Sequence, residues 1–191
     1  CVGVVFFCIL FYESRCIYCG FYSTITPHAE KANTMDLYVD ALCKEAITEK
    51  NYLFGEYSNT AERIETIYFG GGTPSQLQAY HIEKIFCCIA DNYADRMLNY
   101  SDMEISLECN PDDIKRGMFS GLPVNRVSMG AQTFSDNRLR FLRRRHRAKE
   151  VDYAVKTLHD DGIHNISIDL MFGFPEETLD DWRADIAHAL S

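Results

Sequence analysis

Two cysteines, Cys16 and Cys19, have the residue type and the spacing that metal binding requires. Thiolates are the ligands of iron–sulfur clusters and of many zinc sites. A C-x2-C pair alone also fits a zinc half-site or two unconnected thiols, and a complete zinc site needs a second pair at ligand spacing. The sequence has no such second pair. The zinc interpretation is therefore not favoured.

A glycine run at residues 70–72, followed by Thr73-Pro74-Ser75, is the second candidate for chemistry. Consecutive glycines let the backbone approach a ligand without a Cβ in the way, or they form a tight turn. Neither G-x-G-x-x-G nor a Lys after the glycines is present, which excludes dinucleotide and P-loop sites. Glu108 adds a carboxylate that could bind an amine or act as a helix N-terminal acid.

Five short apolar runs predict the strands that would position these residues. Their apolarity is continuous rather than alternating, which is typical of strands covered on both faces in a parallel sheet. The runs span residues 2–11, 66–69, 103–107, 126–129 and 166–172.

Helical patterns alternate with these runs. Apolar residues at i, i+3, i+4 and i+7 predict helices around residues 82–89 and 151–158. We expect further helices over residues 35–51 and after Thr178, a suitable N-cap, and a weaker helix after Pro111. The alternation predicts an α/β fold with about five parallel strands and right-handed crossovers.

In such a fold the chemistry lies at the carboxyl ends of the strands. Polar, glycine and cysteine residues cluster directly after the predicted strands. These clusters span residues 12–19, 70–75, 108–112, 130–132 and 173–175. We therefore expect the clusters to meet at one edge of the sheet.

Composition and charge exclude several other classes of protein. The chain has 191 residues, 47% hydrophobic and 25% charged, which suffices for one globular domain with a sizeable core. A formal net charge of −9 argues against a nucleic-acid partner, and the basic run at 138–147 is local. The irregularly spaced cysteines favour a reduced, cytoplasmic setting over a disulfide framework. The apolar run at residues 2–12 falls short of the roughly 20 residues that span a bilayer, so we expect no membrane-spanning segment.

Several ordered motifs resemble those of radical S-adenosylmethionine (SAM) proteins, within the oxygen-independent coproporphyrinogen III oxidase group. The motifs are R-C-x-Y-C-x-F-Y-S at 15–23, I-Y-F-G-G-G-T-P-S at 67–75, E-x-N-P-D-D at 108–113, N-R-V-S-M-G at 125–130, Q-T-F at 132–134, R-R-H at 144–146 and S-I-D-L-x-x-G-x-P at 167–175. The E-x-N-P form and the R-R-H triplet resemble the haem chaperones of this group, called HemW, more than the oxidases. The resemblance covers essentially the whole chain and implies a partial, truncated (β/α)6-type barrel.

The resemblance also implies two cofactors. A 4Fe-4S cluster would be held by three cysteines in C-x3-C-x2-C, of which Cys16 and Cys19 are the last two, and SAM would bind its open iron. Electron transfer into SAM would then release a deoxyadenosyl radical. By position, the family's SAM contacts would fall on Tyr18, Gly71, Gly72, Thr73, Glu108, Gln132, Arg144 and Asp169. Glu108 and Asp169 would accept hydrogen bonds from the ligand, and Arg144 would face its carboxylate.

Tyr12 stands where the resemblance places the first cluster cysteine. The family run Y-x-H-I-P-F-C reads F-F-C-I-L-F-Y at residues 6–12. Cys8 does not readily substitute, because four residues of extended strand place its sulfur roughly 13 Å away at about 3.3 Å per residue. A tyrosine phenolate is a harder ligand that needs a strongly lowered pKa. We predict that the chain binds a 4Fe-4S cluster poorly or not at all.

Three functions remain open at this point. A HemW-type protein would bind haem or a porphyrin, take electrons from a donor and pass haem to a receiving protein. An oxidase would convert two propionates of coproporphyrinogen III to vinyl groups. A degenerate relative without a cluster would do neither, and Tyr12 leaves enzymatic activity undecided.

Two further expectations concern the basic run and the extent of the domain. Residues 143–147 would contact propionates or form a solvated helix face, and His146 would bind haem iron or be a surface or hydrogen-bonded histidine. We expect residues 1–191 to form a radical SAM core that is incomplete at both ends and lacks the family's C-terminal domain.

Overall fold

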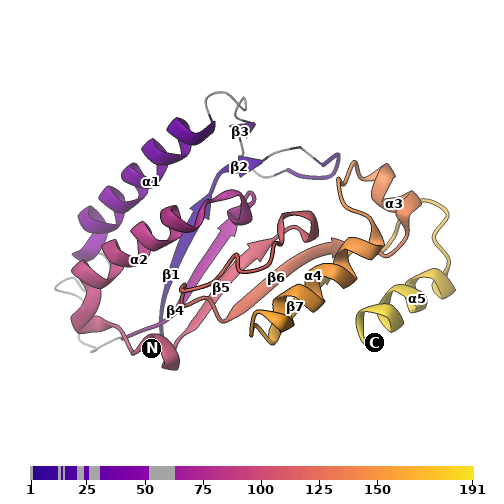
Figure 1. Cartoon of the computed structure of the whole chain (residues 1–191). Coiled ribbons are helices and arrows are strands. Elements are labelled where there is room, and N and C mark those ends of the chain that lie inside the picture. Colours follow the sequence, from indigo (N-terminus) through magenta and orange to yellow (C-terminus); the bar gives the residue numbers. More distant parts are fainter. Residues whose placement is uncertain (1, 13, 15, 21–23, 26–30, 52–62) are drawn as a thin grey trace.

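Five parallel strands form the central sheet of this structure, a computed structural model that describes residues 2–12, 14, 16–20, 24–25, 31–51 and 63–191. In sheet order they are β1 (Val2–Ile9), β4 (Arg63–Gly71), β5 (Glu104–Cys109), β6 (Arg126–Gln132) and β7 (Asn165–Leu170). Neighbouring strands pair in parallel throughout. Because all five strands run parallel, their carboxyl ends lie at one edge of the sheet (Figure 1).

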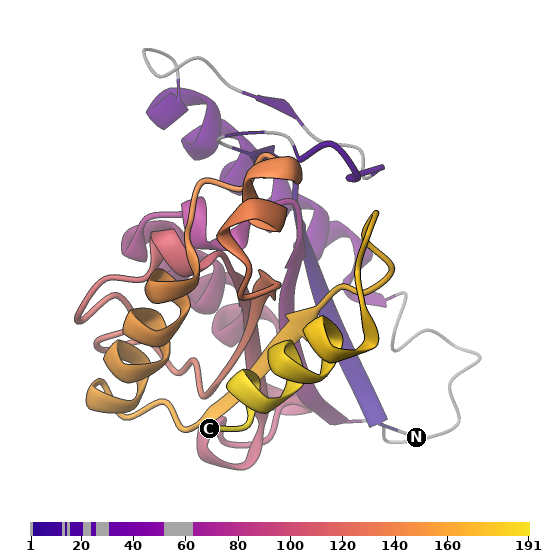
Figure 2. The ribbon, with the colours of Figure 1, turned by 90° about the vertical axis from the view of Figure 1, so that its right-hand side faces the viewer.

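Helices connect the strands and flank the sheet. They are α1 (Lys31–Thr48), α2 (Ala79–Tyr93), α3 (Asp136–Phe141), α4 (Ala148–Asp160) and α5 (Leu179–Ala189). Helices α1, α2 and α4 lie on one side of the sheet, whereas α5 lies beside β7 (Figures 1 and 2). Short 3-10 turns lie between these elements. After α1 comes η1 (Glu49–Asn51), after β4 comes η2 (Pro74–Gln76), between α2 and β5 come η3 (Ala94–Arg96) and η4 (Tyr100–Asp102), and after β5 comes η5 (Pro111–Asp113). Within the described residues, no helix combines the length and apolarity needed to cross a membrane.

The hydrophobic core lies between the sheet and the helices α1, α2 and α4. Ile67, Ile105 and Val127 bring side chains from three neighbouring strands to this core, and all three are completely buried. Ile85 of α2 and Ala154 of α4 close it from the helix side. Full burial of one such aliphatic side chain stabilises the fold by about 1.5–3 kcal/mol, so this layer holds the helices against the sheet.

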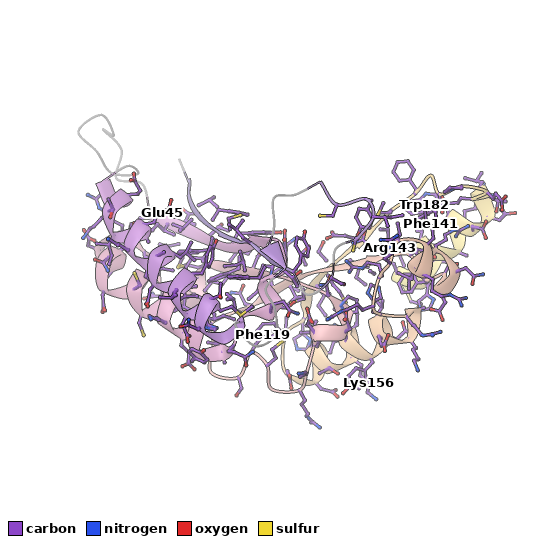
Figure 3. All side chains as sticks on the ribbon, turned by 90° about the horizontal axis from the view of Figure 1, so that it is seen from above. Glu45, Phe119, Phe141, Arg143, Lys156 and Trp182 are labelled. Atoms are coloured by element: carbon purple, nitrogen blue, oxygen red, sulfur yellow. The ribbon has the colours of Figure 1, made fainter. Side chains whose placement is uncertain are left out.

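The opposite face of the sheet is more open. Val4 and Phe6 on β1 are 52% and 55% exposed, and Phe6 stacks on Tyr68 of β4 with ring centroids 5.4 Å apart. Seen from above, the molecule extends from the end of α1, near Glu45, to the end formed by α3 and α5, near Trp182 (Figure 3). The open face leads directly to the polar strand ends.

The predicted α/β fold with five parallel strands is confirmed, with differences at three places. The first apolar run is interrupted, because β1 ends at Ile9 and residues Phe11–Tyr12 form β2, which pairs with β3 (Thr24–Ile25) in a separate small sheet. The helix expected after Pro111 is a single 3-10 turn, because the backbone is already extended at Ile114, with φ −70° and ψ 124°. Gly117 and Gly121, with positive φ angles of 72° and 77°, keep the following segment from resuming a helix.

The third difference is a helix that the sequence did not predict, whereas one predicted helix start is confirmed. The helix α3 was not predicted, because its six residues bury one side chain, Leu139, and such a short helix has no apolar period to detect. Thr178 is confirmed as the N-cap of α5. Its hydroxyl accepts a hydrogen bond from the Asp181 amide at 3.2 Å, and the Asp181 carboxylate accepts one from the Thr178 amide at 2.9 Å.

Candidate functional site

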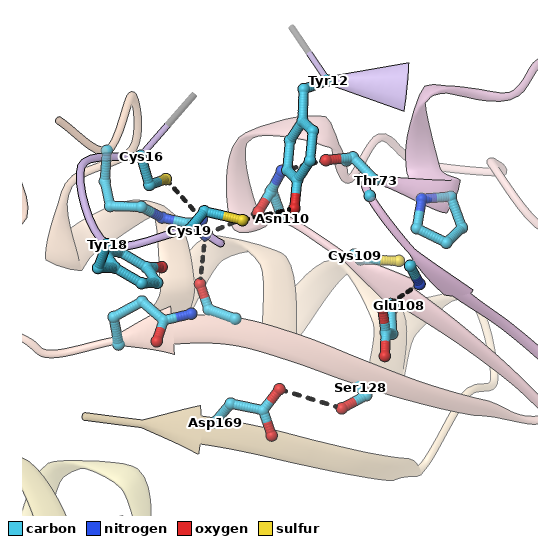
Figure 4. A pocket seen from close by; sticks show the side chains of 16 residues that line it. Tyr12, Cys16, Tyr18, Cys19, Thr73, Glu108, Cys109, Asn110, Ser128 and Asp169 are labelled. Carbon is cyan, nitrogen blue, oxygen red and sulfur yellow. Dashed lines mark hydrogen bonds between the residues drawn. The ribbon is translucent and has the colours of Figure 1, made fainter. Parts of the chain in front are cut away.

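A cavity of about 200 Å³ lies at the carboxyl edge of the sheet (Figure 4). Its walls come from the ends of β4, β5, β6 and β7 and from the loop after β2. All the predicted site residues line it: Tyr12, Cys16, Tyr18, Cys19, Gly71, Gly72, Thr73, Glu108, Gln132, Arg144 and Asp169. The strand-end segment 173–175 does not line it, so the expected convergence fails for that segment. Arg15 and residues 21–23, which carry part of the resemblance, lie outside the described residues.

Glu108 and Asp169 are the two carboxylates of the cavity. Glu108 accepts hydrogen bonds from the Tyr68 hydroxyl at 2.8 Å and from the Gly71 amide at 3.1 Å, and Asp169 accepts one from the Ser128 hydroxyl at 3.3 Å. Desolvation raises the pKa of Glu108 above its ordinary value, its two donors lower it, and the negative charge of Asp169 raises it again. A cation bound beside these two carboxylates would offset both the desolvation and the repulsion.

The glycine run serves the packing of β4 against β1. A Cβ on Gly72 would lie 2.7 Å from the Ile9 carbonyl oxygen and 2.8 Å from the Phe11 carbonyl oxygen. The Gly72 amide donates a hydrogen bond to the Ile9 carbonyl oxygen at 2.5 Å. Gly71 has a φ of +105°, which side-chain-bearing residues rarely adopt. The absence of a Cβ at these glycines therefore makes room for the neighbouring backbone of residues 9–11 rather than for a ligand. Both glycines also line the cavity.

Arg144 ties three strand-end segments together. Its Nη2 donates to the Asn110 side-chain oxygen at 2.7 Å and to the Gly130 carbonyl at 2.6 Å, and its Nη1 lies 3.6 Å from the Cys16 sulfur. The buried Nε has no hydrogen-bond partner among the described residues. Most donors of Arg144 are thus engaged within the chain, so its first role here is to position the cavity walls.

The two thiols of the C-x2-C pair lie in one turn at the edge of the cavity. The Cys19 amide donates to the Cys16 carbonyl at 3.3 Å, and Cys16 is buried. Tyr18 lies between them in the chain, and burial raises the pKa of its hydroxyl to about 12. The turn brings both thiols and the Tyr18 backbone to the cavity that contains Glu108 and Asp169.

The described residues do not supply a third ligand for a three-thiolate cluster. The Tyr12 hydroxyl lies 3.0 Å from the Cys19 sulfur. Burial is the larger cause, and this hydrogen bond the second, that raises the pKa of the phenol above its ordinary value. Cys109 also lines the cavity, but burial raises the pKa of its thiol and its sulfur faces the Leu107 carbonyl at 3.9 Å. Among the described residues, no three His, Cys, Asp or Glu side chains gather closely enough to hold a metal ion. The site does not fit a 4Fe-4S cluster.

Three residues shape the cavity that were not predicted as site residues. Tyr68 fixes Glu108, Asn110 accepts from Arg144, and Ser128 fixes Asp169. The alternation of side chains along paired strands could have indicated Tyr68, because it pairs with Ser106, two residues before Glu108, and therefore faces the same side of the sheet. Ser128 gives the same signal, because it pairs with Glu108 on β5 and with Ser167, two residues before Asp169, on β7. Asn110 gives no comparable signal, since its contact with Arg144 joins segments distant in the sequence.

His146 is a buried, hydrogen-bonded histidine. Its Nε2 lies 3.1 Å from the Ala131 carbonyl oxygen, and its side chain is inaccessible. Desolvation, and then the charge of Arg144, lower the pKa of the imidazole to about 4. The structure therefore supports the hydrogen-bonded interpretation of His146 over a surface histidine or a haem ligand.

The basic run after α3 is largely engaged with carboxylates of the same chain. Arg145 forms ion pairs with Asp112 and, at 3.0 Å, with Asp113, and Arg147 lies 3.6 Å from Asp136. Arg145 and Arg147 thus already have acidic partners and present less free positive charge to a propionate.

Comparison with known proteins identifies the family. Residues 13–189 match the radical SAM superfamily. The chain belongs to this superfamily. The predicted membership is confirmed, and the strand-end cavity described above therefore belongs to a radical SAM fold.

The radical SAM relatives include several proteins named heme chaperone HemW. The chain is 34% identical to that of Synechocystis sp. (strain ATCC 27184 / PCC 6803 / Kazusa) over 191 residues, covering 96% of this chain and 43% of the relative. It is also 34% identical to that of Bacillus subtilis over 189 residues, covering 96% and 46%. The mouse protein named "Radical S-adenosyl methionine domain-containing protein 1, mitochondrial" is 29% identical, covering 93% and 38%. The chain spans less than half the length of these relatives.

Solved structures show the same radical SAM fold. Coproporphyrinogen III oxidase (HemN) from Escherichia coli superposes with a TM-score of 0.80 at 24% identity, covering 98% of this chain and 41% of that one. The archaeal Elp3 of Methanocaldococcus infernus superposes with a TM-score of 0.58 at 16% identity, covering 100% and 43%. The five parallel strands thus correspond to part of a radical SAM barrel, as predicted.

Proposed function

We propose that the strand-end cavity binds SAM and that the chain is part of a haem-handling protein of the HemW type. The observation that carries the first half is the placement of Glu108 and Asp169 in one cavity with the glycine edge of β4. SAM has a sulfonium and an ammonium group, and two carboxylates in a partly desolvated site are complementary to such a ligand. Identity of about one third to HemW proteins supports the second half.

Each residue of this site has a separate part in holding SAM. Glu108 and Asp169 accept hydrogen bonds and balance positive charge, and both are pre-oriented by Tyr68, Gly71 and Ser128. Gly71, Gly72, Thr73 and Gln132 form the walls, and Tyr18 closes the side of the thiol turn. Arg144 holds the segments together, and its Nε–H, which has no partner among the described residues, is the donor left for the carboxylate of the ligand. Bound SAM would supply an activated sulfonium centre beside the thiol turn.

The oxidase alternative is less well supported. Oxidative decarboxylation of propionates requires the radical that a 4Fe-4S cluster generates from SAM, and the described residues do not fit that cluster. A haem-binding function does not depend on this step. The proposed partners of this chain are therefore haem or a porphyrin and a haem-receiving protein. An electron donor is a further partner only where a cluster is bound.

We also propose a reducing, cytoplasmic setting for the chain. Its support is the cysteine chemistry, since the cysteines of the described residues are free thiols: Cys8, Cys16, Cys19, Cys43, Cys87, Cys88 and Cys109. Free thiols persist in compartments where glutathione and thioredoxin keep them reduced.

Two titrations test the proposed function. Isothermal titration of the chain with SAM should give one-to-one binding that is weakened by Asp169→Asn, and a haem titration followed by its absorption spectrum should give saturable binding. Product formation from coproporphyrinogen III under anaerobic reduction would support the oxidase instead. Failure of both SAM and haem to bind a folded chain would refute the proposal.

A further inference from the structure

Tyr12 occupies the part of the cavity beside the two thiols. It lies at the end of β2, and its ring enters the cavity between Cys19 and Thr73 (Figure 4). The phenol oxygen and the Cys19 sulfur are 3.0 Å apart and share a hydrogen bond. The ring therefore fills the space on one side of the thiol turn, and Cys19 already has a protein partner there.

The thiol turn is held by contacts that do not involve Tyr12. The Cys19 amide donates to the Cys16 carbonyl at 3.3 Å, and the Ile17 amide donates to the Leu142 carbonyl at 3.4 Å. The Arg144 Nη1 group donates to the Cys16 sulfur at 3.6 Å. A change at residue 12 should therefore leave both thiols near their present positions.

The acidic wall is also built without Tyr12. Glu108 is fixed by Tyr68 and Gly71, and Asp169 is fixed by Ser128, all on neighbouring strands of the main sheet. Tyr12 belongs to the separate small sheet of β2 and β3. The two carboxylates of the acidic wall thus have supports that do not include Tyr12, and Arg144 links the thiol turn to the strand ends.

We infer that Tyr12 separates two binding functions of this cavity: the chain binds SAM without an iron–sulfur cluster, and the single substitution Tyr12→Cys restores cluster binding. The inference rests on the proposed SAM site for its first half. Its second half follows from the thiol turn alone, because the new thiolate would complete C-x3-C-x2-C with two cysteines already in place. Removing the ring also opens the space that a cluster needs.

Iron and sulfide counting after anaerobic reconstitution tests the second half. The unmodified full chain should retain less than about one iron, and Tyr12→Cys should retain about four irons and four sulfides with visible cluster absorption. Tyr12→Ser is the matched control, because it opens the same space without a thiolate and should stay near the unmodified chain. Tyr12→Cys combined with Cys16→Ala should lose the gained iron. Circular dichroism establishes that each variant is folded.

Titration of the unmodified, iron-free chain with SAM tests the first half separately. Saturable binding supports it, and absence of binding to the folded chain refutes the proposed SAM site whatever the iron counts. About four irons in the unmodified chain, lost in Cys16→Ala, would overturn the inference directly. An equal iron gain in Tyr12→Ser, or no gain in a folded Tyr12→Cys, would refute the assignment of Tyr12 as the residue that prevents cluster binding.

Discussion

Replacing Glu108 with glutamine is the perturbation that best separates ligand binding from folding. The carboxylate is fixed by the Tyr68 hydroxyl at 2.8 Å and the Gly71 amide at 3.1 Å, and glutamine can keep both partners, since its oxygen accepts and its amide group donates to a hydroxyl. The substitution removes the negative charge and little else. We expect Glu108→Gln to fold normally and to bind SAM more weakly.

The magnitude follows from the interaction that is lost. A hydrogen bond to a charged group contributes about 1.5–3 kcal/mol, and every 1.4 kcal/mol is tenfold in affinity, so SAM should bind about 10- to 100-fold more weakly. Desolvation raises the pKa of Glu108 in the folded chain. Its ionised form therefore costs folding free energy above that pKa, and the cost disappears as the pH falls through it. At neutral pH the unfolding temperature of Glu108→Gln should equal or exceed that of the unmodified chain.

Isothermal titration and thermal unfolding, run on the same samples, measure both effects. Glu104→Gln is the matched control, because Glu104 lies at the other end of β5 and pairs with Arg126 at 3.8 Å, away from the cavity. The control should leave SAM affinity unchanged. Unaltered SAM affinity in Glu108→Gln, or equal losses in both variants, would refute the reasoning.

Two predictions concern stability. His146 is neutral in the folded chain with a pKa of about 4, below its ordinary value of 6.5, so unfolding takes up a proton as the pH falls between these values. Stability should decline over that window, and His146→Asn should flatten the decline in unfolding temperature against pH; an unchanged slope would contradict a buried neutral imidazole. Asp185 is buried and accepts from the Thr133 hydroxyl at 2.6 Å and the Phe134 amide at 3.0 Å. Asp185→Ala should cost about 1–3 kcal/mol for each donor left unpaired, as measured by urea unfolding, and a loss under 0.5 kcal/mol would show that water replaces the carboxylate.

The positions of the strands, and the edge at which the site lies, were predictable from the sequence. Apolar runs that alternate with helical patterns require a parallel sheet, and polar residues after each run must then share one edge. Glu108 and Asp169 could be placed together on this argument alone. Cys16 and Cys19 could be joined to them because their segment also follows a predicted strand.

Contacts between distant segments were not predictable. The role of Gly72 depends on the backbone of β1, which approaches to 2.7 Å of the position that a Cβ would occupy. The partners of Arg144 lie on two other strand ends and in the thiol turn, and no local pattern encodes them. The break between β1 and β2 is equally hidden, since the apolar run continues across it from Ile9 to Phe11.

The occupancy of the strand-end cavity tests the central claim most directly. A crystal structure of the chain grown with SAM should show the ligand between the ends of β4 and β7, with its positively charged groups facing Glu108 and Asp169. Density for SAM at another surface, or an empty cavity at a concentration that saturates binding in solution, would contradict it.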